Sequence, residues 1–220
     1  MGLDFNARRD VLMAFATPVA QTRVREAAEI NPGLRRTILD REAAAPAQSR
    51  SNVGGWQSKA DFLTWGGKEI AVLEESFREA AGRMMALLAH PQHCELDQEL
   101  VAWANVCRAG HYHALHTHSK HHWSGVYYVE VGTGAPDWPR SGVLEVQDPR
   151  GCVDMAGMPG NPFGRTIAIT PVSGMMVVFP SWLYHWVNPY HGAGERISVA
   201  FNSRITKYRV VEAEAGDATG

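Results

Sequence analysis

The chain has 220 residues, 45% of them hydrophobic, and its 21 basic and 23 acidic residues give a formal net charge of −2. These values describe an ordinary globular protein that can bury a sizeable core as one domain. The small net charge provides no bulk electrostatic attraction to nucleic acid or to a membrane surface, so we expect neither as a partner.

The cysteines and the N-terminal residues bear on the cellular compartment. Only Cys94, Cys107 and Cys152 occur, an odd number without paired spacing, which argues against a disulfide framework. The N-terminus is charged where a signal peptide has an apolar core, and no apolar run approaches the roughly 20 residues of a membrane span. The sequence therefore predicts a cytoplasmic protein.

The part of the chain before about Leu100 favours helices. Asn31 is a plausible N-cap with Pro32 at the first helical position, so a short helix is expected after them. The segment Ala43–Gly55, rich in small and polar residues, reads as a connecting loop. A second helix, packed on a sheet, is predicted by apolar residues spaced three and four apart: Ile70, Leu73, Phe77, Ala81, Met84 and Leu88.

From Leu100 onward the pattern changes to short β-type runs separated by Gly and Pro. Such runs, with no helix-length periodic segment between them, point to a sandwich or barrel. The Gly- and Pro-rich stretch Asp148–Arg165 predicts either a lid or a disordered loop, and the polar tail from Glu212 is expected to fray. The predicted strands are Leu100–Cys107, Ser124–Val131, Val143–Gln147, Thr166–Thr170, Met175–Phe179 and Arg196–Ile205.

Alternation in the last predicted strand gives it two different faces. Ile197, Val199 and Phe201 share an apolar face, whereas Arg196, Ser198, Ala200 and Asn202 share a small and polar one. A solvated outer face would give the same pattern. The preceding His185, eleven residues before Arg196, favours instead a barrel interior that binds an acidic small molecule.

Histidines suggest a metal site. His116 and His118 lie two apart and point the same way if the segment is extended, so with His185 they can bind one ion. His111 and His113 have the same spacing, so spacing alone leaves the pair ambiguous. We prefer His116 and His118, because they lie closer to the apolar strand that follows. A cluster of histidines is often only a solvated loop, and His185 can be a hydrogen-bonded core residue.

Simpler interpretations apply to the remaining histidines and to three of the tryptophans. His90, His93 and His191 lack a metal-site context and are expected at the surface. Three tryptophans are plausible walls of the pocket, with core packing as the alternative for each: Trp123, Trp182 and Trp186.

The order of His116-x-His118, His185, Arg196 and Ser198 resembles the double-stranded β-helix, or jelly-roll, iron and 2-oxoglutarate dioxygenases, which include the prolyl hydroxylases. A bacterial group of oxygenases in that superfamily, without a settled substrate, is similar over roughly residues 51–205. The segments that carry this similarity are Ser51–Ser58, Ser124–Tyr128, Asp148–Arg150, Phe179–Leu183 and Glu195–Asn202.

The resemblance implies the fold and its division along the chain. It implies an α+β, mainly β, double-stranded β-helix with N-terminal helices packed on the sheet. The chain is then a single oxygenase domain over residues 1–220. Residues 1–98 form an α-rich part, residues 99–207 the jelly-roll core and residues 208–220 a tail.

The resemblance also implies cofactors and roles. Fe(II) would be held by His116, His118 and His185, and 2-oxoglutarate would be the co-substrate. Arg196 would pair with the distal carboxylate of 2-oxoglutarate, because a guanidinium engages both carboxylate oxygens at once. Ser198 would donate a hydrogen bond to that carboxylate. Asn105 and Tyr128 are weaker candidates for contacts to the oxoacid. The implied reaction hydroxylates an unknown substrate and releases succinate and CO2.

One departure from the family pattern stands out. The superfamily usually has Asp or Glu where this chain has His118, so the metal ligands would lack one negative charge. Glu130, Glu145 and Asp148 supply carboxylates only at positions that do not match the motif. Two rival functions therefore stay open. One is a cupin-like three-histidine dioxygenase or isomerase without 2-oxoglutarate, and the other is a non-catalytic module that binds metal or a small acid.

The sequence leaves the partners largely open. The substrate is a small molecule or a protein side chain. A homodimer is a candidate assembly, through an exposed Asn105–Cys107 edge or through the α-rich part.

Overall fold

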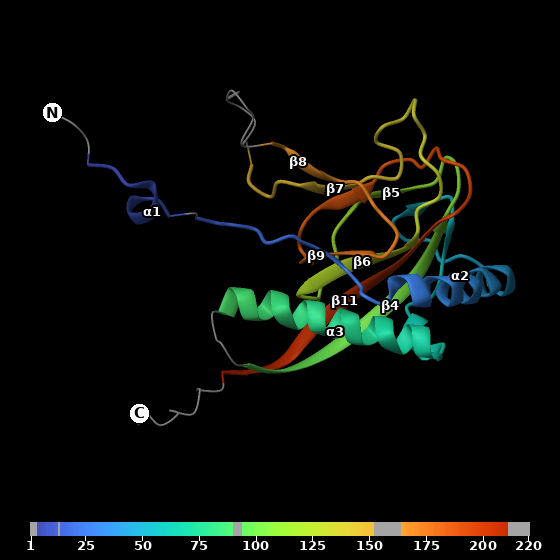
Figure 1. The fold of residues 1–220 in the computed structure, drawn as a ribbon, viewed down its shortest axis with the longest axis horizontal. Helices are drawn as coiled ribbons and strands as arrows, with labels where there is room; N and C mark the ends of the chain where they lie inside the picture. Colours follow the sequence, from blue (N-terminus) through green and yellow to red (C-terminus); the bar gives the residue numbers. More distant parts are fainter. Residues whose placement is uncertain (1–3, 13, 90–93, 152–163, 211–220) are drawn as a thin grey trace.

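The computed structural model describes residues 4–12, 14–89, 94–151 and 164–210. They form two antiparallel sheets facing each other, with two long helices on the outer face of one sheet (Figure 1). Most of the predicted lid Asp148–Arg165 lies outside these residues, as do His90, His93 and the tail that is predicted to fray. Among the described residues no helix is both long enough and apolar enough to cross a bilayer.

The six-stranded sheet has the order β1-β9-β6-β11-β4-β3. Its longest ladder joins β4 and β11 and starts from Arg196 opposite Cys107. The strands are β1 Ala20–Arg23, β3 Trp56–Gln57, β4 Cys94–Cys107, β6 Trp123–Glu130, β9 Met175–Pro180 and β11 Arg196–Val210.

The five-stranded sheet has the order β2-β5-β10-β7-β8. From β4 to β11 the chain moves back and forth between the two sheets, and the winding is that of a jelly roll. The strands are β2 Asn52–Val53, β5 Tyr112–His116, β7 Leu144–Gln147, β8 Thr166–Ile169 and β10 His185–Val187.

Two helices cover the outer face of the six-stranded sheet (Figure 1). The predicted second helix is α3 Lys68–Ala89, and its apolar positions are buried from Ile70 to Met84, while Leu88 is half exposed. The helix predicted after Asn31 is α2 Ala27–Ala44. The remaining helices are short: α1 Ala7–Asp10 and the 3-10 turn η1 Phe62–Thr64.

The predicted N-cap at Asn31 is wrong, because α2 begins four residues earlier and contains Pro32. Proline is tolerated there at the cost of one helical hydrogen bond. The Asn31 side chain instead ties the helix to the sheet: its amide donates to the Val129 carbonyl (3.0 Å), and its oxygen accepts from the Tyr127 hydroxyl (2.6 Å).

The alternation predicted for the last strand is present in β11. Ile197, Val199 and Phe201 are fully buried in the core beneath the helices. Arg196 and Ser198 face the opposite way, into a cavity between the two sheets. The polar face is therefore an interior one, not a solvated surface.

Phe77 on α3 stacks on Phe201 of β11, with ring centroids 4.0 Å apart and both side chains fully buried. We expect Phe77→Ala to lower the free energy of unfolding by about 3–5 kcal/mol in urea denaturation, because it leaves a cavity where helix meets sheet. Leu88→Ala, on the same helix but half exposed, should cost less than about 1 kcal/mol. Equal losses in the two variants would contradict this packing.

Several strand predictions need correction. Predicted strands 100–107 and 196–205 are both longer, because β4 and β11 continue as a paired ribbon to Cys94 and Val210. The strands β1, β2, β3, β5 and β10 were not predicted. They have two to five residues, too short for alternation to show.

The exposed Asn105–Cys107 edge is also wrong. Asn105 and Cys107 are each 3% exposed, because β3 pairs with β4 there, with Gln57 opposite Asn105. This segment therefore offers no open edge for a dimer.

Candidate active site

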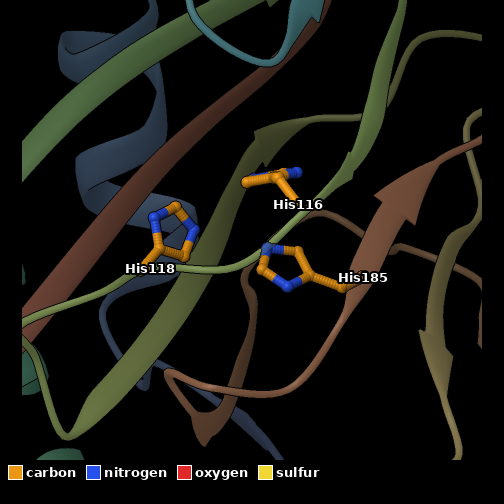
Figure 2. A group of neighbouring side chains, drawn as sticks. All are labelled: His116, His118 and His185. Atoms are coloured by element: carbon orange, nitrogen blue, oxygen red, sulfur yellow. The ribbon is translucent and has the colours of Figure 1, made fainter.

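Three histidines meet at one end of the cavity (Figure 2). One ligand atom from each of His116, His118 and His185 lies within 4.8 Å of the other two. The ring centroids are 4.3 Å apart for His116 and His185, and 4.9 Å apart for His116 and His118. Three imidazole nitrogens at this separation can share one divalent transition-metal ion.

Strand pairing brings these residues together. His116 on β5 lies directly opposite His185 on β10 in the five-stranded sheet. His118 follows the end of β5, where its backbone N–H donates to the Ser181 carbonyl (2.9 Å). Its ring lies 5.6 Å from that of Trp103 on the facing sheet, so the site joins both sheets.

Backbone carbonyls fix the tautomer of two of the rings. Nδ1 of His116 lies 2.7 Å from the Ala114 carbonyl, and Nδ1 of His185 lies 2.8 Å from the Leu183 carbonyl. A carbonyl only accepts, so each Nδ1 carries the proton and each Nε2 keeps its lone pair for a metal. The Ser51 hydroxyl, 3.3 Å from Nε2 of His116, can donate to that lone pair.

Burial keeps these rings neutral. It lowers the pKa of His185 to about 3 and that of His118 to about 4, and the neighbouring imidazoles add to the effect. The pKa of His116 is lowered by burial as well. Neutral imidazole is the form that binds metal, so the site is ready for an ion at neutral pH.

Acidification should destabilise the metal-free protein. An unfolded imidazole titrates near pH 6.5, above the folded pKa of His185 and His118. Between these values the unfolded chain binds more protons, so the free energy of unfolding falls as the pH falls. We expect a loss on the order of 1–2 kcal/mol per buried imidazole from pH 7 to pH 5 in urea denaturation. His185→Asn should reduce this loss, whereas substitution of exposed His191 should not; equal stability at both pH values would contradict buried neutral rings.

Arg196 is a buried cation in the same cavity. It is 2% exposed, its Nε donates to the Gly142 carbonyl (3.2 Å), and its guanidinium carbon lies 5.1 Å from the ring centroid of Tyr128. Nη2 has no hydrogen-bond partner, and none of the described carboxylates forms an ion pair with this guanidinium. A buried charge without a counter-ion is costly, and an acidic ligand would remove that cost.

A row of polar side chains crosses the sheet beside Arg196. Ser198 on β11 lies opposite Asn105 on β4 and opposite Tyr128 on β6. The Asn105 side-chain oxygen and the Tyr128 hydroxyl are buried without hydrogen-bond partners. Burial raises the pKa of Tyr128, so its phenol stays protonated and can donate. The structure thus brings Arg196, Ser198, Asn105 and Tyr128 to one wall.

The cavity that contains both groups has a volume of about 1090 Å³. This is the size of a pocket for a small organic ligand. Histidines occupy the five-stranded side, and Arg196 with its polar row occupies the six-stranded side. A ligand between the sheets would therefore meet a metal site and a cation together.

The predicted tryptophan walls are wrong: none of Trp123, Trp182 and Trp186 lines the cavity. Trp123 and Trp186 are sequence neighbours of the lining residues Ser124 and His185, so alternation turns them to the other face. Trp182 lies in a turn and is 55% exposed. Trp103 on β4 is the tryptophan that lines the cavity.

The rival histidine pair does not form part of the three-nitrogen group. His111 accepts a hydrogen bond from the Arg108 backbone N–H (3.0 Å) and so stabilises a turn. His113 lines the cavity but is only 8% exposed, and its ring lies between Ser51 and Cys107, at 3.5 and 3.7 Å. The sequence did not predict that His113 lines the cavity, since only the register of β5 against β10 distinguishes His113 from His116.

The carboxylates considered as substitute ligands are occupied elsewhere. Glu130 pairs with Arg35, Glu145 with Arg140, and Asp148 with Arg150. None of the three belongs to the cluster of ligand atoms. In the described residues the metal would therefore meet three neutral imidazoles and no carboxylate.

Comparison with known proteins agrees with this fold and site. The model of the family described as "Putative 2OG-Fe(II) oxygenase" matches residues 101–202. A comparison with curated proteins returned no match.

Three solved structures illustrate the similarity of fold. A prolyl-4-hydroxylase from Pseudomonas putida has a TM-score of 0.61 at 18% identity, covering 86% of this chain and 93% of that one. A prolyl hydroxylase from Trichoplax adhaerens, in complex with a peptide fragment of hypoxia inducible factor, has a TM-score of 0.64 at 11% identity, covering 86% and 84%. HygX from Streptomyces hygroscopicus, with nickel and 2-oxoglutarate bound, has a TM-score of 0.55 at 13% identity, covering 93% and 90%.

The two sheets have the double-stranded β-helix fold, and the three histidines form a candidate metal centre within it. Over residues 101–202 the chain is similar to the 2OG-Fe(II) oxygenases, and its fold is similar to that of prolyl hydroxylases. The fold class predicted from the sequence is therefore confirmed, and the family match supports the predicted oxygenase with Fe(II) and 2-oxoglutarate as cofactors.

Proposed function

We propose that His116, His118 and His185 hold Fe(II) and that Arg196 pairs with the distal carboxylate of 2-oxoglutarate. The observation that carries this assignment is the buried Arg196 guanidinium, whose Nη2 has no partner, in the same cavity as the three ligand nitrogens. A dicarboxylic acid that binds a metal at one end and a cation at the other fits both groups at once.

The polar row gives the oxoacid a defined orientation. Ser198 and Tyr128 carry hydroxyl donors beside the guanidinium, so they can donate to a carboxylate that Arg196 has already neutralised. Asn105 lies on the other side of Ser198 and contributes its amide. When bound, the iron and 2-oxoglutarate would supply the oxidising chemistry together with O2, giving up one oxygen atom to succinate, with release of CO2, and the other to a hydroxylated C–H bond.

The protein's own contribution is positioning and exclusion of water. Two metal-binding rings are held by backbone carbonyls, and Arg196 by the Gly142 carbonyl. Rigid ligands keep the reacting groups in register without a further cost of ordering. Phe179, whose ring centroid lies 4.7 Å from that of His185, shields the metal side from solvent.

His118 gives this site one negative charge fewer than a site with two histidines and a carboxylate. A neutral set of ligands leaves the full dipositive charge of the ion for other groups to balance. The anionic oxoacid then becomes a larger part of that balance. We propose that iron binding and 2-oxoglutarate binding are strongly coupled in this chain.

Turnover measurements test this proposal. Purified protein with Fe(II), 2-oxoglutarate and O2 should release succinate in a 1:1 ratio to the 2-oxoglutarate consumed, at least in slow uncoupled turnover. Oxygen consumption without 2-oxoglutarate loss would favour a cupin-like three-histidine enzyme. Absence of turnover in iron-loaded protein would favour a binding module.

We further propose that the protein works in a reducing, cytoplasmic environment, because Cys107 is a free and buried thiol. The unidentified substrate enters the cavity directly.

A further inference from the structure

The cavity mouth carries cations in addition to Arg196. Arg50, Lys59 and Lys120 line it, and all three are exposed, in contrast to the buried Arg196. Among the residues that the structure describes, no Asp or Glu lines the cavity, although the chain as a whole has a net charge of −2. The mouth is therefore positive on a weakly acidic protein.

Separate segments bring these cations to one opening. The ladder of β3 against β4 continues past Gln57, because the Ser58 N–H donates to the Ala104 carbonyl (2.9 Å). Alternation then turns Lys59 to the cavity face, beside Trp103. Lys120 lies in the turn two residues after His118.

Arg50 lies in the segment that crosses from one sheet to the other. The Gln48 N–H donates to the Gln57 carbonyl of β3 (2.8 Å), and the Ala114 N–H of β5 donates to the Ser51 carbonyl (2.8 Å). Arg50 stands between these two attachments, and thus between the sheets at the opening.

The rim cations have no carboxylate counter-ion among the described residues. In the described part of the chain none of Arg50, Lys59 and Lys120 forms an ion pair with a carboxylate, whereas many other cations do, among them Arg35, Arg108 and Arg204. Lys120 also has a positive φ of 72°, a backbone conformation that is uncommon for a residue other than glycine. The turn thus keeps a lysine at the mouth despite an unfavourable backbone.

The cavity contains more cationic side chains than the binding of 2-oxoglutarate requires. In the proposed function, one carboxylate of 2-oxoglutarate binds the metal and the other binds Arg196, both deep between the sheets. The rim cations lie in the exposed outer part of the cavity, where a second molecule would bind. The volume of about 1090 Å³ leaves room for such a molecule.

We propose, on the basis of the proposed function, that the substrate is a small organic anion whose carboxylate or phosphate lies against Arg50, Lys59 and Lys120. Its carbon skeleton then lies along Trp103, between the rim and the three histidines, with the C–H bond to be oxidised turned inward. The rim discriminates against neutral analogues of the substrate, because the rim cations stay unpaired when a neutral analogue binds.

Matched small probes test this charge preference. The protein is loaded with Mn(II) and 2-oxoglutarate, and a 2-oxoglutarate titration verifies that the oxoacid is bound. Phenyl phosphate, phenylacetate and phenylacetamide are then titrated by ligand-observed NMR. We expect at least one acid to bind roughly tenfold or more tightly than the amide; comparison of the two acids shows whether phosphate or carboxylate is preferred.

Variants locate the preference at the rim. Arg50→Gln, Lys59→Gln and Lys120→Gln should each reduce the ratio of amide to acid dissociation constants, and the triple variant should bring it near one. The ratio cancels any general loss of affinity. Lys68→Gln removes an exposed charge at the start of α3, on the helical side, and should leave the ratio unchanged.

The outcomes separate the two proposals. Failure of 2-oxoglutarate to bind contradicts the proposed function. Equal binding of acid and amide, no acid binding, or a preference that survives in the triple variant contradicts the anionic substrate while leaving the oxygenase assignment intact.

Discussion

Replacing Arg196 by Gln should lower kcat/KM for 2-oxoglutarate by roughly 100-fold or more, because a buried, charge-assisted pair is worth about 3 kcal/mol. Arg196 is 2% exposed and has no carboxylate partner in the described residues, so the lost interaction is with the oxoacid. The measurement is succinate release over a range of 2-oxoglutarate concentrations. Arg196→Lys should retain part of the activity, since lysine keeps the charge but not the bidentate geometry.

Arg196→Gln is expected to have the opposite effect on the stability of the ligand-free protein. The unpaired cation costs free energy in the ligand-free protein, so Arg196→Gln should unfold at an equal or higher temperature than the wild type. Only the additional stabilisation by 2-oxoglutarate should be lost. A variant that unfolds early and still gains stability from 2-oxoglutarate would contradict the proposed role of Arg196.

Removing one imidazole should have the second large effect. His185→Ala leaves two of the three ligand nitrogens, and we expect iron affinity to fall by roughly 100-fold or more, given that even changes outside the ligand shell cost 10- to 100-fold. Metal content after dialysis and a competition titration with a chromophoric chelator measure this loss. His191→Ala, an exposed ring stacked on Trp138, is the matched control and should bind iron like the wild type.

His118 allows the opposite change. His118→Asp supplies the carboxylate that this site lacks, so it should bind Fe(II) more tightly than the wild type in the absence of 2-oxoglutarate. The coupling between iron and 2-oxoglutarate should then weaken, because the protein already balances part of the ion's charge. Unchanged coupling in this variant would show that the neutral ligand set is not its cause.

The sequence predicted those parts of the fold that depend on local periodicity. The α3 stripe from Ile70 to Met84 and the two faces of β11 follow from spacings of three to four and of two. Alternation placed Arg196 and Ser198 on one face, and the nearby His185 favoured the interior for that face. His185 was identified from its neighbours in sequence, although the three-residue strand that carries it was not.

What the sequence could not provide was pairing between distant segments. The choice of His116 over His113 depends on β10 pairing with β5, and the position of Ser198 between Asn105 and Tyr128 depends on three strands lying side by side. The tryptophan error has the same origin, because closeness in sequence to a lining residue means the opposite face in a strand. The positive rim likewise appears only when the 48–51 segment, the end of β3 and the turn after His118 meet at one opening.

Anaerobic titration of the iron-loaded protein with 2-oxoglutarate tests most directly whether the three histidines and Arg196 form one site. Chelation of the oxoacid to the metal should produce a visible metal-to-ligand charge-transfer band that saturates at one equivalent per chain. The band should be absent in His185→Ala and should require much higher 2-oxoglutarate concentrations in Arg196→Gln. No band in protein with iron demonstrably bound, or an identical titration in Arg196→Gln, would contradict the assignment.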